Sequence, residues 1–339
     1  MKVAIIGSKA PDSLESNLKE SFDYNGHEAE VYDIYNDARY SNPKYGKYFT
    51  QLNILRRKYF DSYDQEVFTQ LARQIISDKP DLVIGVYRFI HPILVQTIKK
   101  ELKCKIIHVN PDALTTFEHQ QVFASDYDVW FTKDPYIVNF MTNNMKLNAK
   151  LYSEAFNSRG HVKPNISKAQ CEDDINIDVM TYGTMYPYRC RMLKYVLDSG
   201  IDLKVFGIKP NRFYNNSIDS AFQNKYITGT EKATILYGSK IVFNQMHYAE
   251  IESVNNRFFE TNGSGAFQIS DYRPILHDLL PQGVDVELVS FKGIDDAIEK
   301  LHYYLKHPEV RYDIASKVYA HFMEKYSYDS LIKYILNEI

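Results

Sequence analysis

The sequence is poor in the features that mark several classes of protein. It has three cysteines in 339 residues, and Cys104, Cys171 and Cys190 have neither the even number of a disulfide framework nor the spacing of a metal site. No apolar run approaches the roughly 18 residues of a membrane-spanning helix. The first apolar run, Val3–Ile6, is too short for a secretory signal. We therefore expect a cytoplasmic protein without a membrane span.

Neither sign of charge is in excess. Forty basic residues against 43 acidic ones give a formal net charge of -3, whereas nucleic-acid-binding domains usually show a clear basic excess. We therefore expect no nucleic-acid partner. The share of apolar residues, 45%, and of charged residues, 24%, is typical of folded globular chains. The length suffices for about two domains of roughly 150 residues each.

Short apolar runs alternate with segments of helical periodicity along most of the chain. This alternation is typical of βαβ units and predicts parallel sheets. Residues 157–177 lack the pattern and contain an acidic run, which indicates a linker. We predict an N-terminal domain over residues 1–156, a C-terminal domain over 178–326 and a last helix over 327–339. In the C-terminal domain the predicted strands are 178–181, 203–206, 240–244, 266–269 and 286–291.

The segment from Glu252 to Phe267 carries the clearest chemical pattern. It predicts a helix that begins at Val254, with Ser253 as its N-cap and Gly263 as its stop. The free amides at the start of such a helix form an anion site. Glu260 lies one turn deeper, where its carboxylate can accept hydrogen bonds from the two hydroxyls of a ribose.

The same segment resembles a known element. Glu252 and Glu260 are separated by seven residues, as in the Glu-x7-Glu element of retaining GT-B glycosyltransferases. The run Asn256-Arg257-Phe258-Phe259-Glu260, followed by Gly-x-Gly-Ala-Phe, is similar to the CgeB-type branch. This resemblance covers most of the chain and is strongest over residues 240–311.

The resemblance implies two tandem Rossmann-like domains that face each other across a cleft, with the last helix crossing back to the first domain. It also implies that a sugar moves, with retention, from a UDP-, GDP- or dTDP-sugar donor to an acceptor, without a metal or another cofactor. In the family the donor lies on the C-terminal domain. The acceptor, which is a saccharide, glycolipid, protein or small molecule, lies on the N-terminal domain, and peripheral contact with a membrane is compatible with this arrangement.

The resemblance also assigns roles to individual residues. Glu260 would bind ribose, Glu252 would lie near the donor sugar and Arg257 would support the phosphates. The turn after the first strand of the C-terminal domain adds Gly183 and Arg189, because ligands of such sheets bind at the carboxyl ends of the strands. The predicted donor-binding residues are Gly183, Thr184, Arg189, Asn244, Ser253, Asn256, Arg257, Glu260 and Gly263. The predicted catalytic residues are Glu252, His247 and His119, the last on the acceptor side with His91 and Asp112.

Structural interpretations compete with these roles. Arg257 can pair with Glu260, Arg189 can pair with Asp219, and the basic run 56–58 is typical of a solvated helix face. Two other functions also fit the sequence. One is a GT-B-like epimerase acting on a nucleotide sugar, and the other is a two-domain sugar-binding protein without catalysis.

Overall fold

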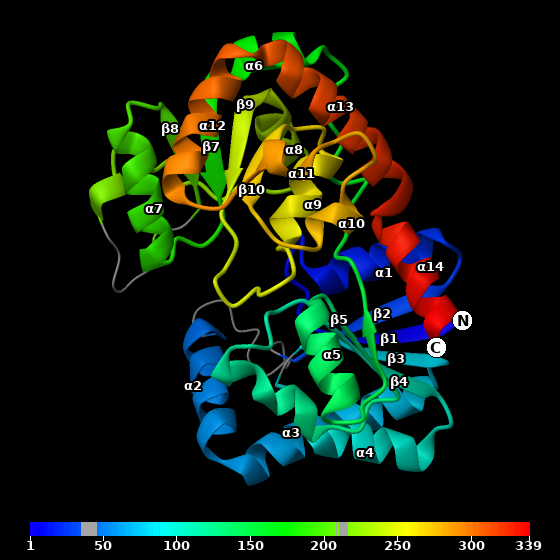
Figure 1. The fold of residues 1–339 in the computed structure, drawn as a ribbon. Coiled ribbons are helices and arrows are strands. Elements are labelled where there is room, and N and C mark those ends of the chain that lie inside the picture. Colours follow the sequence, from blue (N-terminus) through cyan, green and yellow to red (C-terminus); the bar gives the residue numbers. More distant parts are fainter. Residues whose placement is uncertain (35–45, 88, 208, 210–215) are drawn as a thin grey trace. The chain divides into compact units, whose positions relative to one another are not determined.

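A computed structural model describes residues 1–34, 46–87, 89–207, 209 and 216–339, without the side chains of residues 47 and 117–120. The chain divides into two units, Met1–Tyr152 with Leu331–Ile339 and Ser153–Ser330. Each unit is a parallel sheet covered by helices, which confirms the predicted α/β class (Figure 1). No helix of the described residues is long and apolar enough to cross a bilayer.

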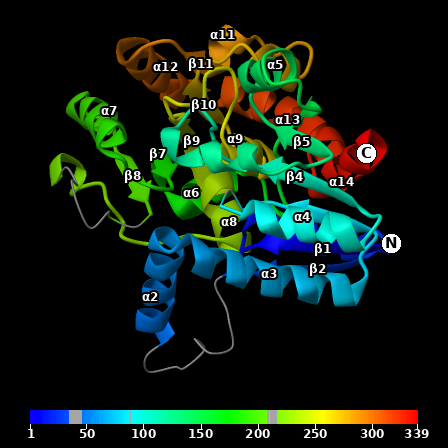
Figure 2. The ribbon, with the colours of Figure 1, turned by 90° about the horizontal axis from the view of Figure 1, so that it is seen from below.

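Unit 1 contains a six-stranded sheet in the order β2-β1-β3-β4-β5-β6, and all of its pairings are parallel. Because β1 has β2 on one side and β3 on the other, the order of the strands reverses there. Figure 2 shows α3 and α4 side by side. The elements are β1 Lys2–Gly7, α1 Leu14–Tyr24, β2 Glu28–Asp33, α2 Gly46–Tyr59, α3 Asp61–Asp78, β3 Leu82–Gly85, α4 Pro92–Glu101, β4 Lys105–Asn110, η2 Phe117–Ala124, β5 Val129–Thr132, α5 Pro135–Asn143 and β6 Ala149–Leu151.

Unit 2 contains a five-stranded parallel sheet in the order β11-β10-β9-β7-β8. Its strand order reverses between β7 and β9. The helices and strands are α6 Lys168–Ile175, β7 Ile177–Tyr182, α7 Pro187–Asp198, β8 Leu203–Phe206, η3 Asn216–Ile218, α8 Gly229–Gly238, β9 Ser239–Asn244, α9 Asn256–Gly263, β10 Gln268–Asp271, α10 Leu276–Leu279, α11 Val286–Val289, β11 Ser290–Phe291, α12 Ile294–Lys306, α13 Pro308–Lys325 and α14 Tyr328–Glu338.

Two segments differ from what the sequence pattern suggests. The apolar run 286–291 is mostly the short helix α11 rather than a strand, because the Asp285 side chain accepts a hydrogen bond from the Glu287 amide at 3.0 Å and caps a helical turn. Residues 157–177 contain α6, whose N-cap is Ser167. Helix α14 begins in unit 2, and from Leu331 onward it is part of unit 1. There the Tyr334 hydroxyl donates to the Leu151 carbonyl at 2.7 Å.

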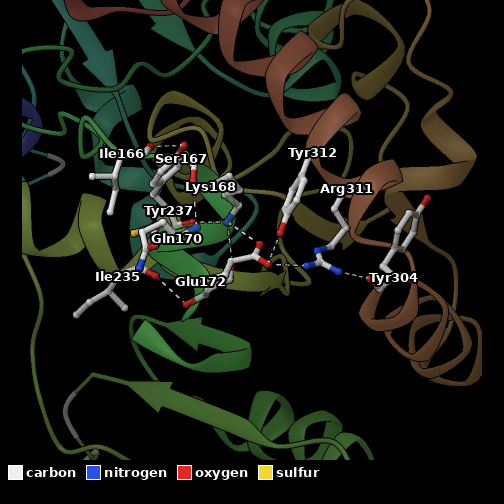
Figure 3. A network of polar contacts seen from close by, with 12 residues as sticks. Ile166, Ser167, Lys168, Gln170, Glu172, Ile235, Tyr237, Tyr304, Arg311 and Tyr312 are labelled. Carbon is white, nitrogen blue, oxygen red and sulfur yellow. Dashed lines mark hydrogen bonds and ion pairs between the residues drawn. The ribbon is translucent and has the colours of Figure 1, made fainter. Parts of the chain in front are cut away.

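A buried charged network fastens α6 to α13 within unit 2 (Figure 3). The carboxylate of Glu172 lies 2.7 Å from Nη2 of Arg311 and 3.2 Å from Nζ of Lys168. It also accepts from the Tyr312 hydroxyl at 2.9 Å. The Lys168 ammonium donates to the carbonyls of Tyr237 and Ser239 as well. Every charge in this network therefore has a protein partner, as buried charges require.

Candidate functional site

The carboxyl ends of β7 and β9 lie next to each other where the strand order of unit 2 reverses, which is where ligands of open α/β sheets bind. The turn after β7 depends on two glycines. Gly183 has φ +102°, a conformation that favours glycine. Gly207 follows β8, and a Cβ atom there would lie 2.4 Å from the Gly183 carbonyl oxygen. The chain therefore folds back more tightly at this point than residues with side chains allow.

Two arginines lie beneath this turn. Arg189, 2% exposed, donates to the carbonyls of Thr184 at 2.5 Å and Tyr182 at 3.2 Å. Arg257 donates to the carbonyls of Tyr182 and Gln245, both at 2.7 Å. Burial lowers the pKa of both guanidinium groups, and for Arg189 the neighbouring charge of Arg257 lowers the pKa further. Arg257 is half-buried, and neither arginine forms an ion pair with a carboxylate of the described residues, although the charges of Glu250 and Glu260 partly oppose the lowering of the Arg257 pKa. The pairing of Arg189 with Asp219 that the sequence allowed does not form, since Asp219 pairs with Lys209.

Buried amide side chains organise the loop between β9 and α9. Asn244 and Asn255 exchange hydrogen bonds at 3.1 and 3.0 Å, and Asn244 also contacts Gln268 at 3.2 Å. The Asn255 side chain accepts from the Phe258 amide at 3.1 Å, so Asn255 is the N-cap of α9. The prediction that Ser253 caps a helix from Val254 is therefore wrong. An asparagine is as good a cap as serine, and here it is fixed by the amide network.

Glu260 is buried, and its carboxylate accepts hydrogen bonds from three side chains. Its Oε1 accepts from the Lys232 ammonium at 2.8 Å and from the side-chain Nδ2 of Asn256 at 3.2 Å. Its Oε2 accepts from the Tyr182 hydroxyl at 3.1 Å. Burial, followed by the charge of Glu260, raises the pKa of Tyr182 well above its usual value, so Tyr182 stays a donor. A carboxylate has about four acceptor positions, so roughly one is left for a ligand.

The sequence patterns missed two residues of this site. Lys232 projects from the buried face of α8 together with Ala233 and Leu236, and a lysine on an apolar helix face was the available signal. Gln245 follows β9 and is fully buried, and its Nε2 atom has no hydrogen-bond partner in the part of the chain that the structure describes. Nothing in its spacing singled it out.

The remaining predicted donor residues lie around this centre. Ser253 is buried in the loop before α9. Gly263 is the last residue of α9 and packs against Phe156, where a Cβ atom would come within 2.2 Å of the ring. Thr184 contributes its carbonyl to Arg189, while its own side chain is exposed. The structure thus places Gly183, Thr184, Arg189, Asn244, Asn256, Arg257 and Glu260 in one region of unit 2.

The predicted catalytic residues are more scattered. Glu252 is half-buried in the loop between β9 and α9. His247 lies in the same loop, and its Nδ1 accepts from the Ala249 amide at 3.1 Å. Tyrosine rings surround His247, with centroid distances of 5.3 Å to Tyr186 and 4.4 Å to Tyr248. The side chain of His119 lies outside the described residues.

Unit 1 holds a cavity of its own, of about 660 Å³, at the carboxyl end of β3. His91 lies in its wall. Its Nδ1 accepts from the Ile93 amide at 3.1 Å, so in the neutral ring Nε2 carries the proton and donates to Asp61 at 3.3 Å. Asp112 is placed outside this wall. The lining residues are Ile54, Arg57, Lys58, Asp61, Asp64, Tyr87, Phe89, Ile90, His91, Pro92, Gln121 and Ala124.

Comparisons with known proteins agree with this architecture. Residues 189–337 match the family model described as Glycosyl transferase-like. The spore protein CgeB of Bacillus subtilis (strain 168) is 22% identical over 307 residues, which cover 80% of this chain and 92% of CgeB.

Solved structures extend the agreement to the whole chain. Sucrose-phosphate synthase from Thermosynechococcus elongatus superposes with a TM-score of 0.70 at 10% identity, over 99% of this chain and 98% of the synthase. HepE from Anabaena, solved in complex with UDP and glucose, gives 0.66 at 9% identity over 100% of both chains. The chain therefore has the GT-B glycosyltransferase fold, and its predicted resemblance to the CgeB-type branch is confirmed.

Proposed function

We propose that the protein is a glycosyltransferase that moves a sugar from a nucleoside diphosphate sugar to an acceptor, with retention of anomeric configuration and without a metal. The observation that carries this proposal is the pair of neighbouring arginines, the buried Arg189 and the half-buried Arg257, at the carboxyl end of the unit 2 sheet. They hydrogen-bond to carbonyls and form no ion pair with a carboxylate of the described residues. An anionic diphosphate placed there would supply a direct ion-pair partner, and the complexes of HepE with UDP support this kind of ligand.

The donor then fits the site as follows. The diphosphate lies at the Gly183 turn and the start of α9, where the amides of Asn256 and Arg257 and the helix dipole favour negative charge. The ribose hydroxyls take the acceptor position that remains on Glu260. The unpaired Nε2 of Gln245 is a further donor toward the ligand.

Beyond the positive charge around the diphosphate, the reaction needs few groups from the protein. The bond between the anomeric carbon and the phosphate oxygen breaks, while the acceptor oxygen bonds to the same face of that carbon. The acceptor proton passes to the departing diphosphate, and the buried positive charge stabilises the negative charge that develops there. Glu252 and His247 are the side chains we assign to the sugar end of the donor, in the loop between β9 and α9. The acceptor is assigned to unit 1.

A donor panel tests this function directly. The full-length protein is incubated with UDP-, GDP- and dTDP-hexoses, and free nucleotide and new glycosides are measured with and without candidate acceptors. A nucleotide at 100 times its dissociation constant should stabilise the protein by about 2.7 kcal/mol in a thermal melt. Release of nucleotide that depends on an acceptor supports the proposal.

Two outcomes would overturn it. Conversion of the nucleotide sugar to its epimer without any acceptor would indicate an epimerase. Tight binding of free sugar with no preference for its nucleotide form would indicate a sugar-binding protein without catalysis.

A further inference from the structure

Helix α2 turns its polar face toward unit 1 and its apolar face toward the solvent. The residues that face unit 1 are polar or small, and they recur at intervals of four, three and four residues. Asn53 is buried and accepts from the Tyr63 hydroxyl at 2.9 Å, while Arg57 pairs with Asp64 at 2.7 Å. The inward set is Gly46, Thr50, Asn53 and Arg57.

The opposite face is an exposed apolar stripe. Tyr48, Leu52, Leu55 and Tyr59 follow the same spacing and are 71%, 55%, 51% and 69% exposed. At about 100° per residue this stripe lies roughly opposite the inward set. A surface helix normally buries such a stripe against the core. Here the polar face of α2 packs against α3 instead. The apolar face of α2 is therefore available to a partner outside unit 1.

The charge around the stripe indicates what that partner is. Arg56 and Lys58 lie about 80° to either side of the stripe. Residues 46–60 include four basic residues and no acidic one, although the whole chain has a net charge of -3. A helix with an apolar face, flanking cations and tyrosines at both ends is the kind that lies in the interface of a bilayer and is attracted to anionic lipids.

We propose that α2 docks unit 1 on an anionic lipid surface, with the stripe in the headgroup region and Arg56 and Lys58 at the lipid phosphates. Three α2 residues, Ile54, Arg57 and Lys58, also line the unit 1 cavity. Because Ile54 and Arg57 project away from the stripe, docking through α2 places this cavity across the helix from the lipid surface. The inference stands on exposure and charge alone, so it is independent of the proposed glycosyl transfer.

Vesicle co-sedimentation of the full-length protein tests the docking. Vesicles of phosphatidylcholine with about one third phosphatidylglycerol are compared with vesicles of phosphatidylcholine alone. We expect at least roughly tenfold stronger binding to the anionic vesicles, weakened by salt. The double variant L52Q/L55Q should lose at least about tenfold in affinity, and R56Q/K58Q roughly tenfold to thirtyfold.

Matched controls remove exposed groups of the same kind from unit 2. Leu288→Gln and Tyr195→Gln take away apolar side chains that are 48% and 59% exposed, and Lys194→Gln and Lys317→Gln take away exposed charges. These controls should bind like the wild type. Equal binding of all variants, or no preference for anionic vesicles, would overturn the proposal. So would a dimer in gel filtration that L52Q/L55Q dissociates while vesicle binding is unchanged, because the stripe would then be an interface between two copies.

Discussion

Two charge clusters of unit 2 differ in whether a carboxylate pairs with their cations. Around Glu172, one carboxylate lies within ion-pair distance of both Lys168 and Arg311. Beneath the Gly183 turn, Arg189 and Arg257 donate to carbonyls, to the Gln245 side chain and to the Thr181 hydroxyl, and no carboxylate of the described residues pairs with them. In the first cluster a carboxylate lies within ion-pair distance of both cations, whereas in the second the nearby carboxylates of Glu250, Glu260 and Asp271 act only from beyond ion-pair distance. Within one unit, this contrast distinguishes a cluster that holds two helices together from the proposed ligand site.

The largest expected effect is on stability, at the complete cluster. Glu172→Ala leaves Lys168 and Arg311 buried without their counter-ion, which should reduce the free energy of unfolding by about 3–5 kcal/mol. Urea unfolding measures this loss, and nucleotide affinity in the folded variant should be unchanged. Glu299→Ala, at an exposed position of α12, is the control and should change stability by less than about 0.5 kcal/mol. A loss equal to that of the control would show that the network does not hold α6 to α13.

The converse change is Arg257→Gln. It removes one of the two cations that form no ion pair with a carboxylate of the described residues, so folding should change little, while UDP affinity should fall roughly tenfold to hundredfold through lost charge-assisted hydrogen bonds. Isothermal titration calorimetry gives the affinity, and Arg191→Gln on the exposed side of α7 provides a matched loss of charge. If Arg257→Gln unfolded the protein but left UDP affinity intact in the folded fraction, the contrast between the two clusters would be wrong.

The pH dependence of the free energy of unfolding gives a further test of the Glu172 cluster. Burial lowers the pKa of Lys168 to about 8, although the Glu172 charge opposes this shift. The unfolded chain therefore binds more protons than the folded one between about pH 8 and 10.5, and stability should rise with pH in that window. Between about pH 7.5 and 9.5 this group should add about 1–2 kcal/mol. Urea unfolding of Lys168→Met, which cannot titrate, should lack this rise, and an identical pH slope in both proteins would contradict the assignment.

The smallest expected effect concerns Glu260. If its remaining acceptor position holds the ribose, the wild type should prefer UDP to its 2′,3′-dideoxy analogue by roughly tenfold. Glu260→Gln should lose most of that preference, because a neutral amide accepts less strongly. Competition binding measures both ligands in both proteins. A preference that persists in the variant would move the ribose away from Glu260 without affecting the role of Arg257.

The parts of the fold that depend on local pattern could be predicted from the sequence. The strand over Leu203–Phe206 has the boundaries expected from its apolar run. The run 286–291 was misassigned because periodicity alone cannot distinguish a short buried strand from a helical turn, and the Asp285 cap was the overlooked signal. The predicted cap at Ser253 failed for a different reason, since the amide network that fixes Asn255 involves residues far apart in the chain.

In the candidate site, too, features set by local spacing could be predicted and features set by distant contacts could not. The glutamate block around Glu260 was found because its spacing is local. Lys232, which pairs with Glu260, lies 28 residues earlier on another helix, and no spacing rule connects them. The outward stripe of α2 was also hidden, because a helix that buries its polar side has the same periodicity as one that buries its apolar side.

The close approach of Gly207 to the Gly183 carbonyl has a consequence for genetics. A comprehensive substitution scan would find nearly every replacement of Gly207 deleterious, since even alanine would place a carbon 2.4 Å from a backbone oxygen. Its tolerance profile would look like that of a substrate contact, although its role is to let two loops touch. Intolerant positions in such a scan would therefore include residues that let two turns touch as well as residues that contact a ligand.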